Sequence, residues 1–227
     1  NGFESGRRMW IFGYGSLLWY TDFPYDKIVS GTVRGFVRRF WQLSPDHRGT
    51  PEAPGRTVTL VEDEKGSCWG LTYEVPKEEE EKTIAYLDHR EKAGYTCEKV
   101  QFHPDDGSDP FDVLVYISGT VDNEFHAGPT DVEEIAQTIL IRQGPSGPNI
   151  EYALRLALVL RAHSPHADDP HTYAIEKRLL ELVEETGLRR DIVEGLGYSL
   201  VEGKYRPPRG EEAGRVMEAV ATHCSNV

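Results

Sequence analysis

Two stretches of the chain carry residue types that could do chemistry. The first is the loop Gly13-Tyr14-Gly15-Ser16, which follows the apolar run Met9–Phe12. Glycine has no Cβ, so backbone N–H groups can turn toward a ligand there, and a strand that ends in such a loop can hold an anion. A tight turn between two core segments explains the same spacing equally well, so the rest of the chain must decide.

The second stretch contains Glu91, at the end of a helix predicted over residues 76–91. Ile84 and Leu87 lie three residues apart, and Glu91 follows Leu87 by four, so the three share one helical stripe. A carboxylate in apolar surroundings has a raised pKa and can act as a base near neutral pH. Asp88 competes for this role. Pairing of Glu91 with a neighbouring basic side chain at a solvated helix end is the simpler alternative, because most glutamates are exposed.

Other chemistries find less support in the sequence. A dinucleotide fingerprint needs a third glycine where Leu18 stands, and no G-x-S-x-G motif is present for a serine nucleophile. His163, His166 and His171 match no standard helical zinc spacing, so we interpret them as part of a solvated loop. Cys97 has no adjacent positive charge that would lower its pKa, so we interpret it as a packed strand residue.

Charge limits the classes of partner. Lysine and arginine number 25 against 38 acidic residues, which leaves a net charge of −13 over 227 residues. A nucleic-acid-binding role is not expected for so acidic a chain, and an anionic substrate must be held by a local site. Arg38, Arg39, Arg48 and Arg56 could form such a patch for substrate carboxylates, or could pair with the many acids, and both interpretations stay open.

Cysteine usage and hydropathy indicate the cellular setting. The three cysteines, Cys68, Cys97 and Cys224, are widely spaced without a C-x-x-C motif, which is typical of reduced thiols and predicts a cytoplasmic location. The longest apolar run, residues 153–162, contains two arginines, so no membrane span is expected. Residues 1–8 lack the apolar core of a signal peptide, and we interpret them as a remnant of the expression vector.

Hydrophobic periodicity predicts strands first, one helix between them, and helices last. Strands are expected over residues 9–12, 27–43, 57–62, 67–75, 95–103 and 111–118, with 63–66 as a hairpin turn. Helices are expected over residues 76–91, 130–142, 149–163, 173–186 and 190–196. Asn149 is expected to cap the third of these helices. This order indicates an α+β fold in which an antiparallel or mixed sheet curls into a small barrel.

Six motifs occur together and in order along the chain. They are FGYGSL at 12–17, RRFW at 38–41, DHRG at 46–49, PGR at 54–56, YLDHREKAGY at 86–95 and GPSGPNIEY at 144–152. Each motif is weak alone, but the ordered set resembles the ChaC-type, glutathione-specific γ-glutamylcyclotransferases. The resemblance extends from about Met9 to about Leu182, with one departure at His89, where an aromatic or aliphatic residue is expected.

The resemblance implies a fold, a reaction and a site. The fold is γ-glutamylcyclotransferase-like, a small mixed β-barrel with packed helices over residues 9–200, followed by a C-terminal tail over 201–227. The enzyme is a lyase that cleaves glutathione to 5-oxoproline and cysteinylglycine, with no metal and no cofactor. Glu91, of the R-E-x-x-G-Y motif, is then the catalytic acid/base. The residues implied to bind the γ-glutamyl group are Ile11, Phe12, Gly13, Tyr14, Gly15, Ser16 and Leu17.

The resemblance also implies which partners to expect and leaves rivals open. The expected partner is glutathione as a small-molecule substrate, without nucleic acid or membrane, for a protein that is a monomer or homodimer. One rival is a cyclotransferase that acts on other γ-glutamyl amino acids or on γ-glutamylamines. A non-enzymatic interaction protein on the same fold is another, although Glu91 counts against it. A metal-dependent hydrolase that uses residues 163–171 is the third.

Overall fold

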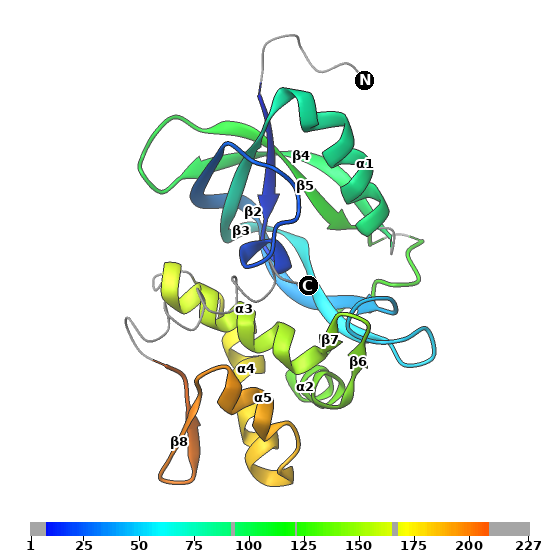
Figure 1. Cartoon of the computed structure of the whole chain (residues 1–227), viewed down its shortest axis with the longest axis vertical. Helices are drawn as coiled ribbons and strands as arrows, with labels where there is room; N and C mark the ends of the chain where they lie inside the picture. Colours follow the sequence, from blue (N-terminus) through cyan, green and yellow to red (C-terminus); the bar gives the residue numbers. More distant parts are fainter. Residues whose placement is uncertain (1–7, 92–93, 121, 165–167, 209–227) are drawn as a thin grey trace. The chain divides into compact units, whose positions relative to one another are not determined.

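The computed structural model describes residues 8–91, 94–120, 122–164 and 168–208 of the chain drawn in Figure 1. The chain divides into two compact units, the first from residues 1–37 with 60–123 and the second from 38–59 with 124–227. Among the described residues, no helix combines the length and the hydropathy needed to cross a membrane.

A closed barrel of mixed strand direction lies mainly in the first unit, although residues 38–44 and 55–59 of two of its strands belong to the second unit. Its strands are β1 (Met9–Gly13), β2 (Lys27–Ser44), β3 (Gly55–Val75), β4 (Tyr95–Pro104) and β5 (Phe111–Ser118), in the order β1-β3-β2-β4-β5. β1 runs antiparallel to β3 and parallel to β5. The α+β class and the curled mixed sheet predicted from the sequence are therefore confirmed. β5 has the predicted bounds, and β1, β2 and β4 extend one residue beyond theirs.

One prediction about the strands is wrong. Residues 63–66 do not form a hairpin turn, because β3 continues as one strand from Gly55 to Val75. Gly66 does not adopt a positive φ. A Cβ there would lie 2.6 Å from Val37 Cγ1 and 3.0 Å from the Phe36 carbonyl oxygen. The glycine therefore permits a close approach of β2 and β3, which sequence alone cannot distinguish from a turn.

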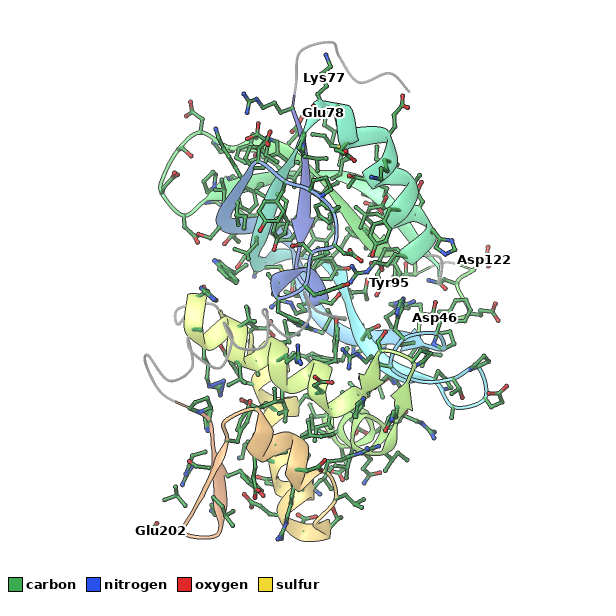
Figure 2. All side chains as sticks on the ribbon, in the orientation of Figure 1. Asp46, Lys77, Glu78, Tyr95, Asp122 and Glu202 are labelled. Atoms are coloured by element: carbon green, nitrogen blue, oxygen red, sulfur yellow. The ribbon has the colours of Figure 1, made fainter. Side chains whose placement is uncertain are left out.

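Helix α1 (Glu80–Arg90) packs on the barrel of the first unit, as Figure 1 shows. A short 3-10 turn, Lys77–Glu79, precedes it, and Figure 2 labels Lys77 and Glu78 at this end of the helix. Leu87 is fully buried in a cluster with Ile11, Tyr73 and Tyr116. Burial of one such leucine side chain contributes about 1.5–3 kcal/mol. This contact fixes the C-terminal end of α1 beside β1.

The second unit is mainly helical. Its elements are α2 (Val132–Ile141), α3 (Asn149–His163), α4 (Pro170–Thr186) and α5 (Arg190–Gly195), with short strand pairs β6 (Gln143–Gly144) with β7 (Gly147–Pro148) and β8 (Ser199–Val201) with β9 (Lys204–Arg206). α3 is apolar on most of its surface and is buried along most of its length, as an all-round hydrophobic helix must be. α2 and α4 pack against it.

The helix starts differ from the prediction in several places. α1 begins at Glu80 rather than at Pro76, because a 3-10 turn comes first, and α2 begins at Val132 rather than at residue 130. Asn149 is the first residue of α3 rather than its cap, and the cap position is Pro148. The buried amide of Asn149 instead accepts the Arg56 N–H at 2.6 Å and donates to the Arg56 carbonyl at 2.8 Å. α4 begins at Pro170, earlier than predicted, because Asp169 accepts the N–H of Thr172 at 3.0 Å and so caps the helix.

The hairpin of β8 and β9 has no counterpart in the sequence prediction. Its turn places Glu202 and Gly203 at φ of 51° and 77°, and Figure 2 labels Glu202 at the tip. Two consecutive positive φ values are typical of a type I′ hairpin turn. Tyr205 on β9 is buried. The hairpin crosses the boundary between residues 200 and 201, where the tail is predicted to begin, and the part of that tail from 209 onward lies outside the described residues.

Candidate active site

The loop after β1 is built around a steric requirement for glycine. A Cβ at Gly13 would lie 2.6 Å from Leu17 Cβ, closer than real Cβ atoms approach, so only glycine fits. The chain then forms a 3-10 turn over Ser16–Leu18, closed by the Leu18 N–H on the Gly15 carbonyl at 3.0 Å. Within the described part of the chain, nothing accepts the N–H groups of Ser16 and Leu17. These amides are available to an anion.

Two buried tyrosines hold the loop in place. Tyr14 donates its hydroxyl to the Tyr116 carbonyl at 2.6 Å, and Tyr73 donates its hydroxyl to the Leu17 carbonyl. Burial raises the pKa of Tyr73, so its phenol stays protonated and remains a donor. Of the predicted substrate-binding residues, Ile11 and Phe12 are buried within β1, whereas the side chains of Ser16 and Leu17 are partly exposed. Ile11 and Phe12 therefore support the loop from within β1, whereas the loop backbone and the Ser16 side chain are accessible to a ligand.

Glu91 lies immediately after α1. Its N–H donates to the Leu87 carbonyl at 2.8 Å, which makes Glu91 the C-cap of the helix. Its carboxylate is 23% exposed and lies 3.4 Å from Nε of Arg90. The structure therefore places Glu91 beside a guanidinium as well as at the end of the buried Leu87 stripe. Pairing with a neighbouring base, the alternative left open by the sequence, is observed.

Arg90 connects the loop to this carboxylate. Its side chain is 13% exposed, and its Nη2 donates to Ser16 Oγ at 2.7 Å while its Nε faces Glu91. Nη1 lies 3.5 Å from Asp22 Oδ1. Sequence reasoning did not identify Arg90 as part of the site, because no local pattern signals a contact between residues so far apart in the chain.

Asp88 has a different environment from Glu91. It is exposed, and its Oδ1 accepts the hydroxyl of Tyr116 at 2.7 Å. Burial, and then this hydrogen bond, raise the pKa of Tyr116. Cys97 pairs with Tyr116 across β4 and β5, as a strand residue should, but its side chain is exposed rather than packed. Partial burial of the sulfur raises the pKa of the Cys97 thiol, which disfavours a nucleophilic role.

The arginines of the possible carboxylate patch lie in the second unit and pair with acids there. The observed pairs are Arg38 with Asp169, Arg48 with Glu151 at 3.3 Å, and Arg56 with Glu134 at 3.2 Å. Arg39 donates to the Arg38 carbonyl at 2.8 Å. These contacts favour the pairing interpretation over a preformed patch for substrate carboxylates.

The histidines do not gather into a metal site among the described residues, where no group of three potential ligands occurs. His163 is exposed, and His166 lies outside the described residues. Nε2 of His171 accepts the backbone N–H of Phe40 at 3.1 Å. Burial lowers the pKa of His171 to about 4, so the ring is neutral at physiological pH. His171 therefore has a structural contact rather than a ligand's geometry.

Comparison with known proteins gives consistent matches. The family model for ChaC-like proteins matches residues 9–185. The glutathione-specific γ-glutamylcyclotransferase 1 of Danio rerio is 44% identical over 178 residues, which cover 77% of this chain and 90% of that protein. The protein of the same name from Homo sapiens is 46% identical over 170 residues, or 74% of this chain and 76% of that protein.

A solved structure agrees with these matches. The crystal structure of a yeast γ-glutamyl cyclotransferase specific to glutathione superposes with a TM-score of 0.70 at 29% identity, covering 77% of this chain and 96% of that chain. The barrel and helices described above are therefore the γ-glutamyl cyclotransferase fold. The family model covers most of the chain, and the resemblance inferred from the ordered motifs is confirmed: the chain belongs to the ChaC-like protein family.

Proposed function

We propose that this protein is a glutathione-specific γ-glutamylcyclotransferase, which releases 5-oxoproline and cysteinylglycine from glutathione. The observation that carries the proposal is the shared contact of Ser16 and Glu91 with one guanidinium, that of Arg90. This contact joins a loop with available backbone amides to a carboxylate at a helix end. The family membership and the names of the relatives support glutathione as the substrate.

The reaction needs few protein groups, because the nucleophile belongs to the substrate. The α-amino nitrogen of the γ-glutamyl group attacks the carbon of its own γ-carbonyl, and the amide bond to the cysteine nitrogen breaks. Attack within one molecule makes orientation the main contribution of the enzyme. Glu91 takes a proton from the α-ammonium group and later gives it to the leaving cysteine nitrogen. The second proton passes from the ring nitrogen to the same leaving nitrogen as the intermediate collapses.

The loop has the complementary task of holding negative charge. The N–H groups of Ser16 and Leu17 would bind the α-carboxylate or the oxyanion that develops on the γ-carbonyl oxygen. Gly13 permits the close approach of the chain to Leu17, and the tyrosine contacts of the loop keep the amides in place. No covalent intermediate with the protein is required in this scheme.

The remaining assignments extend the proposal. Residues 9–200 form the catalytic domain and 201–227 a C-terminal tail. The protein acts in the cytoplasm, as its widely spaced cysteines indicate, as a monomer or homodimer. Size-exclusion chromatography with light scattering measures the oligomeric state, and a trimer or larger assembly would contradict this part.

The test is a product assay with matched carboxylate variants. The protein is incubated separately with glutathione, γ-glutamylalanine and γ-glutamyl-ε-lysine, and the products are identified by mass. We expect 5-oxoproline from glutathione. Equal or faster release from another substrate would favour a cyclotransferase of different specificity, and no release from any of them would contradict the proposal.

The variants assign the acid/base. Glu91→Gln should keep the fold and remove turnover, since the amide cannot accept the ammonium proton. Asp88→Asn, which changes a carboxylate on the last turn of α1, should keep most of the activity. Normal turnover by Glu91→Gln together with its loss in Asp88→Asn would transfer the role to Asp88.

A further inference from the structure

We propose that Arg90 is a positioning residue that keeps Ser16 and the carboxylate of Glu91 in one fixed arrangement. The inference rests on the proposed cyclotransferase function and adds a residue to it. Arg90 acts through its two neighbours: it sets where the loop binds the γ-glutamyl group relative to where the proton is taken.

The contacts use three nitrogens of one rigid group. Nη2 donates to Ser16 Oγ at 2.7 Å, Nε lies 3.4 Å from Glu91 Oε1, and Nη1 lies 3.5 Å from Asp22 Oδ1. A guanidinium is planar, so the directions of these three contacts are locked to one another. A lysine ammonium has no such fork and can satisfy one or two of the contacts only at the expense of the others.

Arg90 is itself held from several sides. The guanidinium lies 6.0 Å from the centre of the Tyr20 ring, within cation–π range. Asp22 accepts a hydrogen bond from the hydroxyl of Tyr86, one helical turn before Arg90 on α1. Leu87, fully buried, anchors the same turn of α1 in the barrel core. The side chain is 13% exposed, so it has little freedom to leave this position.

The contacts of Arg90 set the spacing between the loop after β1 and the carboxylate of Glu91. The loop follows β1 and the carboxylate follows α1, so nothing in the local chain geometry sets the spacing between them. The proposed reaction depends on orientation, and a displacement of about 1 Å in such a site can reduce the rate about 10²-fold. A buried cation that contacts both parts removes this freedom.

The test separates the two contacts by kinetics. Steady-state turnover of glutathione is measured for wild type, Arg90→Gln, Arg90→Lys, Ser16→Ala and the double variant of Ser16→Ala with Arg90→Gln. Loss of a charge-assisted hydrogen bond predicts a fall in kcat of about tenfold to a hundredfold in Arg90→Gln, with a rise in KM. Ser16→Ala should raise KM with a smaller effect on kcat. Arg90→Lys should recover part of the loss.

The double variant is the decisive measurement. Because Arg90 acts on KM through Ser16, adding Arg90→Gln to Ser16→Ala should raise KM no further and should still lower kcat through Glu91. Additive effects on KM would overturn the proposal, as would near wild-type kcat and KM in Arg90→Gln. Arg178→Gln, which removes an arginine paired with Glu133 on the helical unit, is the matched control and should leave both parameters unchanged.

A milder variant keeps the proposal testable if Arg90→Gln does not fold. Asp22→Asn removes the charge that holds Nη1 of Arg90 without altering Ser16 or Glu91, and should lower kcat about threefold to tenfold. Wild-type kinetics in a folded Asp22→Asn, together with full activity in Arg90→Lys, would overturn the proposal. Failure of wild type to release 5-oxoproline would instead contradict the proposed function, so the two failures are distinguishable.

Discussion

Substitution of Gly13 by alanine tests whether the loop after β1 is the substrate cradle. The new Cβ would lie 2.6 Å from Leu17 Cβ, whereas ordinary contact begins at 3.4 Å, so the shortfall is about 0.8 Å. Leu17 Cβ is bonded to the backbone and cannot rotate away as the end of a side chain can. The loop itself must therefore move, and with it the amides of Ser16 and Leu17.

The displacement sets the expected loss of activity. A shift of about 1 Å at a reacting site can cost about 10²-fold in rate. We therefore expect kcat/KM for glutathione to fall about 10²-fold, or about 2.7 kcal/mol of transition-state stabilisation. Crowding of this kind also destabilises the folded state by about 1–3 kcal/mol, which is measured separately by urea unfolding.

The assay compares Gly13→Ala with a glycine substitution that meets no obstacle. A Cβ at Gly195, at the end of α5, has no atom within 4 Å, so Gly195→Ala should retain wild-type kcat/KM. Thermal unfolding is first recorded for each variant. Release of 5-oxoproline is then measured at a temperature at which every variant is fully folded. Unchanged kcat/KM in folded Gly13→Ala would refute the argument that the loop position governs binding.

Three further predictions concern stability and metal dependence. Asp169→Asn removes the carboxylate that pairs with the buried guanidinium of Arg38, so the free energy of unfolding in urea should fall by about 3–5 kcal/mol; a loss no larger than that in Arg178→Gln would contradict this. His171 has a pKa of about 4 when folded against 6.5 when exposed, so the unfolded chain binds its proton first as the pH falls. Wild-type stability should therefore decline between about pH 6.5 and 4 more steeply than that of His171→Gln, and parallel pH profiles would exclude this role. Dialysis against a chelator should leave 5-oxoproline release unchanged, whereas a loss restored by a divalent cation would favour the metal-dependent rival.

Local pattern was a good guide to the regular elements. β5 has its predicted bounds, and α1, which ends at Arg90 one residue before the predicted end, is indicated by its apolar spacing and by Gly94, which adopts a positive φ of 78°. Such features depend on neighbouring residues, which a sequence displays directly. The β8–β9 hairpin was not predicted because its strands are short. Leu200 and Val201 are both exposed, so the sequence lacks the alternation of apolar and polar residues that marks a half-buried strand.

The candidate site also has features that the sequence shows and features that only the structure shows. The glycine loop and Glu91 stand out by residue type, and the ordered motifs identify the family. The sequence could not show whether Gly66 marks a turn or a close approach, because both uses require the missing Cβ. The sequence also could not show whether the clustered arginines bind a substrate or pair with acidic side chains of the protein itself.

By itself, the sequence determined the α+β class, the family and the two chemical groups proposed for the reaction. Only the tertiary structure decided how those groups meet: the barrel brings β1 beside the end of α1, and there Arg90 touches both Ser16 and Glu91. The reason is physical, since helix and strand periodicities arise between near neighbours in the chain. The contact between residue 16 and residue 90 depends on the tertiary structure, in which the closed barrel and the buried Leu87 hold the two residues near each other.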